Sequence, residues 1–428
     1  MKHTIRIVLL AAFMLMITAL VTAQPYNEWV LETTLPNDYG DLGTHMTQLV
    51  HAENQLFLIG GRKYFGEPGI HYFTETWMYD LETKNWTQKA NTTANLTGMG
   101  VAYYNGKIYI KGPWQTTDFH IYDIATDTWS EGSPILEEMY DFGFVAYDGK
   151  IYAATGGIGT TAGNKTLIYD IATDSWSYGA EAPREREGQY GSALVDGKIY
   201  VLGGSDLDWD FPLFLDIYDI ATDTWTSEPI PQAEIASAYG AIGAVGPYVF
   251  IVGGFWDLNE WYESNMTWMY NTETNEWIQQ SNYPFPVSEP GVTTNQNTMW
   301  IAGGLNNLFG AFDPGRRNNE LYAFTLPSGC MDEEATNYNE TAMIDDDSCE
   351  YPASSRGGGG GWPEEVTTQE TPVTPVSEER PPLFAILGED GQVDSVWVIA
   401  GVLFLAVVVG YFLLTQNKPQ TRNKRRKK

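Results

Sequence analysis

The feature that most constrains this chain is an internal repeat, carried by two markers that recur in phase about every 50 residues. The first marker is a pair of glycines after an apolar stretch, and the second is a tyrosine followed seven residues later by a tryptophan. Repeats of this length indicate an array of similar supersecondary units. The glycine pairs are Gly60-Gly61, Gly156-Gly157, Gly203-Gly204, Gly253-Gly254 and Gly303-Gly304, with a degenerate copy at Lys111-Gly112. The tyrosine–tryptophan pairs are Tyr79/Trp86, Tyr122/Trp129, Tyr169/Trp176, Tyr218/Trp225 and Tyr270/Trp277.

Within each repeat, apolar and polar residues alternate in the pattern of half-buried β-strands. Asn105-Gly106, Asp148-Gly149 and Asp196-Gly197 separate pairs of such strands, and these dipeptides favour the positive φ angles of tight hairpin turns. Each repeat is therefore predicted to form a four-stranded meander. Because one meander cannot bury both of its faces, we expect the repeats to pack radially around an axis.

The glycine pair, the tyrosine and the spaced tryptophan together resemble the Kelch-repeat family. The resemblance covers about residues 26 to 328 and implies an all-β fold, a β-propeller. We accordingly predict a propeller domain at residues 24–328.

The number of blades follows from one asymmetry at the end of the repeat array. Tyr322 follows the sixth glycine pair, but the position seven residues later is Gly329, where a tryptophan is expected. An orphan copy lies near the N-terminus, where Asn27-Glu28-Trp29 resembles Asn275-Glu276-Trp277. We therefore predict six blades, the last one closed by the N-terminal strand. A seven-bladed ring would require a blade without markers.

The two ends of the chain carry membrane-targeting patterns. Residues 1–23 place two basic residues before a short apolar run and small residues, as in a secretory signal peptide; an uncleaved signal anchor is the alternative. Residues 394–416 contain a 20-residue uncharged stretch, long enough for a transmembrane helix. The basic tail at 417–428 would hold the C-terminus in the cytoplasm. We predict a single-pass cell-membrane protein with an extracellular propeller. With 55 acidic and 24 basic residues, the chain has no nucleic acid among its expected partners.

The segment between the propeller and the membrane has two predicted parts. Residues 329–351 contain both cysteines, Cys330 and Cys349, and an exported location favours a disulfide between them. This segment is similar to a short Cys-bracketed module of secreted proteins. Its aspartates Asp345, Asp346 and Asp347 would suit Ca²⁺, although a disulfide-closed acidic turn is the favoured interpretation. Residues 352–393, rich in Gly, Pro, Thr and Glu, are predicted to be a disordered stalk.

Six sequons agree with export and predict a glycoprotein, although such motifs also arise by chance in polar loops. Their asparagines are Asn85, Asn91, Asn95, Asn164, Asn265 and Asn339.

A ligand site is expected on one face of the disc. The a–b and c–d turns of every blade share one face and are short, whereas the b–c and d–a loops share the other face and are long. Exposed aromatic rings beside acidic residues suit either a glycan or a protein partner; packing of these rings within their own loops is an equally weighted alternative. The candidate aromatic residues are Tyr64, Trp114, Trp209, Trp256, Trp261 and Phe309.

Two further sets of polar candidates lie in loops. Asp206, Asp208 and Asp210 form a D-x-D-x-D run that would suit Ca²⁺, but it lacks the glycine and terminal glutamate of an EF-hand loop. Arg184 and Arg186 are ligand-binding candidates, although a structural ion pair is the favoured role for this segment.

The sequence also limits the enzyme classes. A copper-radical site like that of galactose oxidase needs a cysteine inside the propeller, which has none. Sialidase Asp-boxes are matched only at their tail, and the histidines lack metal-ligand spacing. We therefore expect a cell-surface module that binds a glycan or a protein. The alternatives are a carbohydrate-modifying enzyme similar to sialic acid epimerases and a structural envelope protein. Ionisable side chains that converge at the axis on the long-loop face would favour an enzyme.

Overall fold

The structure is a computed structural model that describes residues 27–36, 44–64, 70–97, 100–113, 116–158, 161–188, 191–206, 210–232, 235, 238–257, 262–306 and 318–351. All of them lie in one compact unit, residues 1–354; the second unit comprises residues 355–428. The predicted signal peptide, stalk, transmembrane helix and basic tail lie outside the described residues. Within the described part of the chain, no helix is both long and apolar enough to cross a membrane.

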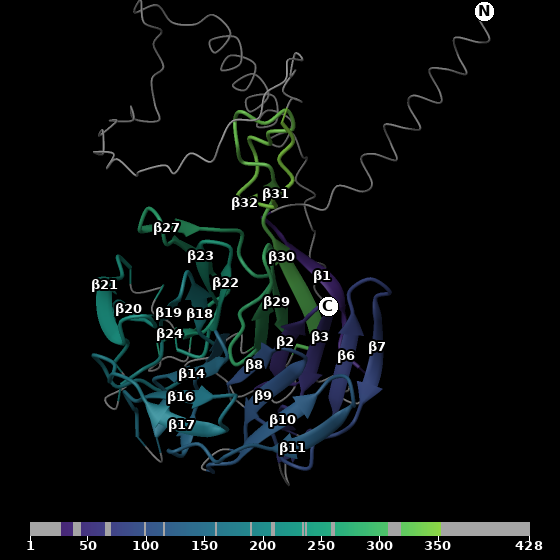
Figure 1. The fold of residues 1–428 in the computed structure, drawn as a ribbon, viewed down its shortest axis with the longest axis vertical. Coiled ribbons are helices and arrows are strands. Elements are labelled where there is room, and N and C mark those ends of the chain that lie inside the picture. The colour runs from purple at the N-terminus through teal and green to yellow at the C-terminus, as the bar shows by residue number, and fades with distance from the viewer. Residues whose placement is uncertain are drawn as a thin grey trace, which may run out of the picture. The chain divides into compact units, whose positions relative to one another are not determined.

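Six four-stranded antiparallel sheets surround a central axis, and each is one blade of a propeller (Figure 1). The first strand of each blade is the innermost, since first strands of neighbouring blades contact one another around the ring. Blades 1 and 2 contain β2 (Gln48–Ala52), β3 (Gln55–Ile59), β6 (Thr76–Asp80), β7 (Asn85–Lys89) and β8 (Val101–Tyr104), β9 (Lys107–Lys111), β10 (Phe119–Asp123), β11 (Thr128–Glu131). Blades 3 and 4 contain β13 (Phe144–Tyr147), β14 (Lys150–Ala154), β16 (Thr166–Asp170), β17 (Ser175–Tyr178) and β18 (Ala193–Val195), β19 (Lys198–Val201), β20 (Phe214–Asp219), β21 (Thr224–Pro229). Blades 5 and 6 contain β22 (Ala241–Val245), β23 (Tyr248–Val252), β26 (Thr267–Asn271), β27 (Glu276–Gln279) and β28 (Gly291–Thr294), β29 (Thr298–Ala302), β30 (Glu320–Thr325), β1 (Trp29–Thr34).

The ring closes as predicted, because the N-terminal strand β1 is the outer strand of blade 6. It pairs antiparallel with β30, with Trp29 opposite Phe324 and Thr34 opposite Glu320. The ring of Trp29 packs edge-on against Tyr283 at 4.9 Å, and its indole nitrogen donates to Oγ1 of Thr267 in blade 5 at 3.0 Å. The first and last strands of the propeller thus share one sheet.

Three of the glycine pairs bring one blade close to the next. A Cβ on Gly60, Gly253 or Gly303 would lie 2.2 to 2.5 Å from a carbonyl oxygen of a neighbouring blade. The second glycine of the same pairs donates its amide to that carbonyl at 2.7 to 2.8 Å. All six of these glycines have positive φ. The glycine pair therefore allows the backbones of neighbouring blades to approach each other closely.

In blade 3 the same pair of backbone conformations occurs one residue earlier, relative to the glycine pair. Thr155 and Gly156 there adopt φ angles of 62° and 126°, which correspond to 63° and 97° at Gly60 and Gly61. Gly157 instead pairs with Tyr140 in the small ribbon of β12 (Met139–Tyr140) and β15 (Gly157–Ile158). The predicted pair Gly156-Gly157 is thus one residue out of phase with the backbone.

The tyrosine–tryptophan marker forms a clamp between blades. The two rings of each pair lie 4.9 to 5.1 Å apart. In blade 3, the Tyr169 hydroxyl donates to Asp174 at 2.6 Å, and this carboxylate also accepts the Ser133 amide of blade 2 at 2.8 Å. The Trp176 indole donates to the Ser133 carbonyl at 2.9 Å. Blades 2 and 4 repeat these contacts, so the marker residues stabilise the ring.

Short ribbons extend beyond the blades. Two of them, β4 (Arg62–Tyr64) with β5 (Ile70–Tyr72) and β24 (Phe255–Asp257) with β25 (Tyr262–Glu263), project from b–c loops. The strands β31 (Ser328–Gly329) and β32 (Ile344–Asp345) pair in parallel within the Cys-bracketed module, where Cys330 and Cys349 form the predicted disulfide. Ile344 is 7% exposed and joins the core between blades 5 and 6. The module is therefore packed on the propeller (Figure 1).

Candidate functional site

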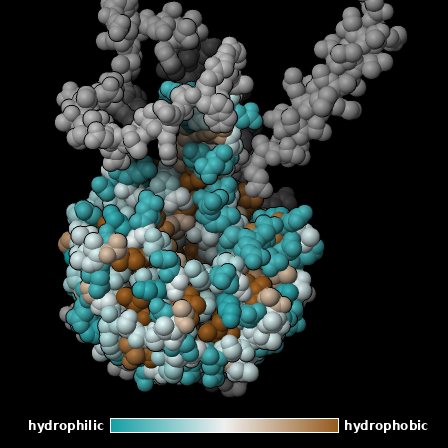
Figure 2. Space-filling view, viewed as in Figure 1, coloured by the Kyte–Doolittle hydropathy of each residue, from teal (hydrophilic) through white to brown (hydrophobic). Residues whose placement is uncertain are grey.

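Two faces of the disc must be distinguished. We call the face of the a–b and c–d turns the turn face, and the face of the b–c and d–a loops the loop face. The Cys-bracketed module lies on the turn face, because Ile344 meets Gly246 in the a–b turn of blade 5. Most of the surface in the view of Figure 2 is hydrophilic, with apolar residues in small separate areas.

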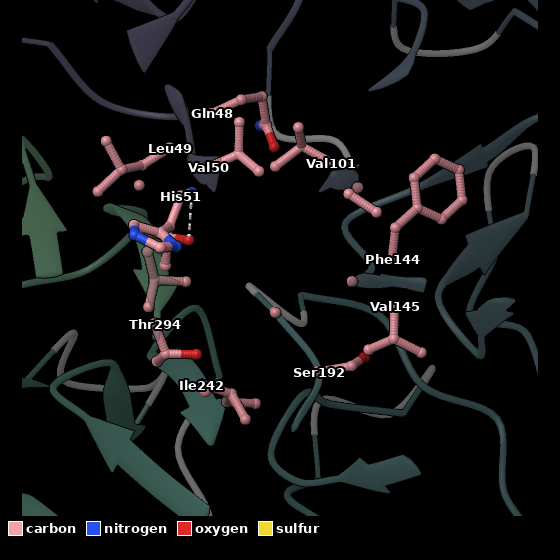
Figure 3. Close-up of a pocket in the computed structure, with 18 of the residues that line it drawn as sticks. Gln48, Leu49, Val50, His51, Val101, Phe144, Val145, Ser192, Ile242 and Thr294 are labelled. Atoms are coloured by element: carbon pink, nitrogen blue, oxygen red, sulfur yellow. Dashed lines mark hydrogen bonds between the residues drawn. The ribbon is translucent and has the colours of Figure 1, made fainter. Parts of the chain in front are cut away.

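A central channel of 310 Å³ runs between the innermost strands of all six blades (Figure 3). Most of its lining is small or apolar, including Val50, Val101, Val145 and Ile242. His51 is an exception: its ring stacks on Trp300 at 5.5 Å, and burial lowers its pKa. Such a wall offers few groups for chemistry, whereas ionisable side chains gather at one end of the channel.

At the loop face, a backbone ring brings residues of successive blades to the axis. Glu289, Tyr239 and Gly188 occupy equivalent positions just before the inner strand, all with positive φ. Tyr239 donates its amide to the Gly188 carbonyl at 2.7 Å, and Glu289 donates to the Tyr239 carbonyl at 2.8 Å. Met46 continues the ring with an amide bond of 2.9 Å to the Glu289 carbonyl.

This ring gathers ionisable side chains that we call the axial cluster. Two hydrogen-bonded pairs belong to it: the Tyr140 hydroxyl donates to Glu187 at 2.7 Å, and His45 Nδ1 lies 2.6 Å from a Glu289 oxygen. The pKa of Tyr239 is raised by burial and then by the nearby charges of Asp141, Glu289 and Glu187. The members come from blades 1, 3, 4, 5 and 6, and they are His45, Tyr140, Asp141, Glu187, Tyr239 and Glu289.

The axial cluster was missed at the level of sequence. Its members lie in d–a loops at two adjacent backbone positions, and their residue types differ from blade to blade. In the structure, each member lies at, or one residue after, a short bridge to the segment near the glycine pair, as for His45 with Arg62 and Glu187 with Ser205.

The aromatic candidates fall largely outside the part that can be described. Trp114, Trp209, Trp261 and Phe309 lie outside the described residues. The backbones of Tyr64 and Trp256 are placed in the b–c ribbons β4 and β24, which extend from the loop face. Their role in binding stays a prediction.

Arg184 and Arg186 are placed together against blade 4. Arg186 is fully buried, and its guanidinium donates to Asp216 at 2.5 Å and to the carbonyls of Gly203 and Phe214. Burial lowers its pKa, and the Asp216 carboxylate opposes that effect. Arg184 also pairs with Asp216 and lies 3.8 Å from the Phe214 ring centre. This geometry fits the structural ion pair that the sequence favours.

The predicted calcium ligands make local turns. Asp206 Oδ1 accepts the Asp210 amide at 2.9 Å, and Asp208 lies outside the described residues. Asp345 and Asp346 each accept an amide two residues ahead, from Asp347 and Ser348. Among the described residues, no group of three or more His, Cys, Asp or Glu side chains is arranged to hold a metal ion.

The sequons divide into two structural kinds. Asn85, Asn91 and Asn95 are exposed, and Asn339 is half-buried in the module. Asn164 and Asn265 donate their side-chain amides to the carbonyls of Ala182 and Tyr283. The threonines of these two sequons, Thr166 and Thr267, are buried at equivalent repeat positions.

The comparison with known families falls on blade 5. Residues 236–282 match the family model described as the Kelch motif. The chain is thus a six-bladed β-propeller in which blade 5 matches the Kelch motif. The matched segment runs from the d–a loop that carries Tyr239 to the end of the last strand of the blade, β27, so it includes one member of the axial cluster. A Kelch propeller suggests a module that binds other proteins. No curated protein matches the chain.

Proposed function

We propose that this Kelch propeller is a cell-surface binding module that holds a protein or glycan ligand on its loop face, over the axial cluster. The Kelch motif carries the proposal, because a Kelch propeller suggests a module that binds other proteins. The convergence of side chains from five blades at one end of the channel indicates the ligand face. A ligand seated there would meet the partly exposed side chains of Glu187, Tyr239 and Glu289, which rest on the buried side chains of His45, Tyr140 and Asp141. The long b–c loops of the same face supply further contact area.

The membrane anchor belongs to this proposal. The apolar stretch at 394–416 and the basic tail support a tether in the plasma membrane, and the sequons support export. The stalk at 352–393 would hold the propeller away from the lipid surface.

The binding test uses the purified full-length chain on a glycan array and against a panel of extracellular proteins. A double variant, Asp141→Asn with Glu187→Gln, should lower the affinity for any ligand found by about tenfold or more, because charged hydrogen-bond acceptors are lost. Tyr178→Ala, an exposed residue on the outer strand of blade 3, is the matched control. Binding that survives both the double variant and alanine at Trp209, Trp256 and Trp261 would disprove the proposed face.

A second function is favoured by the same convergence. The two pairs Tyr140–Glu187 and His45–Glu289 join proton donors to carboxylates, as general acid–base catalysis requires. The chain would then modify a carbohydrate, in the manner of a sialic acid epimerase. Incubation with N-acyl amino sugars, followed by NMR of the sugar, tests it. Turnover that is abolished by Glu187→Gln would support an enzyme. If the sugar is not converted, the enzyme proposal is wrong and the binding module remains the proposed function.

A further inference from the structure

The turn face carries a second concave surface, opposite the axial cluster. It is a groove of 440 Å³ between blades 3 and 4. The Cys-bracketed module approaches other a–b turns, at Gly246 in blade 5 and at Gln296 in blade 6. None of the described residues of that module lines the groove. The residues that line it are Tyr147, Asp148, Lys150, Tyr152, Asp196, Gly197, Asp219, Ile220 and Ala221.

One wall of the groove is an exposed aromatic ring. Tyr147 ends the inner strand of blade 3 and is 41% exposed. Its hydroxyl reaches toward blade 4, since a Cβ on Gly197 would lie 3.4 Å from the Tyr147 oxygen. Tyr152 also lines the groove; it is buried, and its ring lies 6.3 Å from that of Tyr218. The groove therefore combines an exposed tyrosine ring with a buried one.

The polar groups of the groove are held by tight turns. Asp148 and Asp196 occupy the first turn positions with φ angles of 46° and 47°, and both side chains are exposed. Asp219 Oδ1 accepts the Thr222 amide at 3.0 Å, which fixes that carboxylate on the c–d turn. Lys150 adds an exposed ammonium group. Because Asp219 is fixed before any ligand arrives, little freedom of this carboxylate is lost on binding.

The mixture of groups indicates the class of ligand. Carboxylates accept hydrogen bonds, whereas a lysine ammonium and a tyrosine hydroxyl donate them, so a partner whose groups both donate and accept is satisfied at every position. Sugar hydroxyls have this property, and the flat C–H face of a sugar ring can lie on an aromatic ring. We infer that this groove is a binding site for one or two neutral sugar rings of a glycan.

The site is independent of the loop face, so its test can fail without affecting the proposed function. Neutral linear disaccharides and hexasaccharides of glucose, mannose and galactose are titrated into the full-length chain, and binding is measured by calorimetry. Tyr147→Ala should weaken binding at least about tenfold, equivalent to roughly 1.4 kcal/mol. Tyr147→Phe keeps the ring and should change the affinity by less than about threefold.

Tyr178→Ala is the matched control, because this tyrosine is 53% exposed in the same blade but does not line the groove. It should leave the affinity unchanged. A Tyr147→Ala chain that binds as tightly as the wild type would overturn the inference. So would the absence of binding by all of these saccharides, or tight binding of acidic or basic peptides at Tyr147 in their place.

Discussion

At the scale of single residues, Lys111 stands out because it is a fully buried lysine in the degenerate copy of the glycine marker. Its ammonium group donates to the Pro113 carbonyl at 2.7 Å, and burial lowers its pKa to about 8. The other five blades have an apolar residue at this position, namely Ile59, Ala154, Leu202, Val252 and Ala302. The buried lysine therefore lowers the stability of the propeller, and the repeat itself does not require a lysine at this position.

We predict that Lys111→Ile raises the free energy of unfolding by about 1–3 kcal/mol at pH 7. Because the folded pKa lies below the value near 10.4 of an unfolded lysine, the cost is fully present below about pH 8 and fades as the pH rises toward 10. Urea unfolding at pH 7 and pH 9.5 should therefore show a smaller gain at the higher pH. A variant less stable than the wild type at both values would contradict this account.

At the scale of structural elements, the outer hairpins of blades 2, 3 and 4 are each fastened to the preceding blade through one carboxylate, Asp127, Asp174 or Asp223. In blade 5 an asparagine replaces the carboxylate as the acceptor of the tyrosine hydroxyl, since Tyr270 donates to Asn275 at 2.7 Å. The φ angle of Asn275, 59°, is close to the 48° of Asp174. The clamp thus needs an acceptor oxygen and a left-handed backbone more than it needs a charge.

Asp174→Ala should destabilise the propeller by about 2–3 kcal/mol, because it leaves the Tyr169 hydroxyl and the Ser133 amide without their acceptor. Asp174→Asn should cost less than about 1 kcal/mol. The Tyr169 hydroxyl, followed by the Ser133 amide, lowers the pKa of Asp174. The stabilisation from its charge is therefore present above the unfolded pKa near 3.9 and is lost as the pH falls through the folded value. Thermal unfolding of both variants at pH 7 and pH 3 tests the prediction.

The strands and their pairing could be predicted from the sequence, whereas the axial cluster could not. Period-2 alternation and Asn-Gly or Asp-Gly turns encode local hairpins. The closing strand could be predicted because the sequence around Trp29 repeats the motif of another blade. The partner of Arg186 is Asp216, in a strand of the next repeat, and no local pattern links the two. The same holds for His45 and Glu289, which meet only because the ring is closed.

At the scale of the whole molecule, ring closure depends on a single outer strand. Trp29→Ala should cost about 3–5 kcal/mol, because it removes contacts to Tyr283, Phe324 and Thr267. Hydrogen exchange should then accelerate at the amides of β30 that pair with β1. Trp176→Ala is the matched control within a locally closed blade, and it should leave exchange in β30 unchanged. Equal exchange of β30 in both variants would show that closure does not rest on Trp29.

The pairing of β1 with β30 also sets an order of events during synthesis. The first strand of the propeller is made before any of the five intervening blades, and its partner is made last. Throughout that interval β1 is an unpaired edge, and such an edge can associate with other chains. Because its native contact spans nearly the whole domain, closure is a slow, late step. Truncated chains that end before β30 should therefore aggregate, with β1 as the segment that joins one molecule to the next.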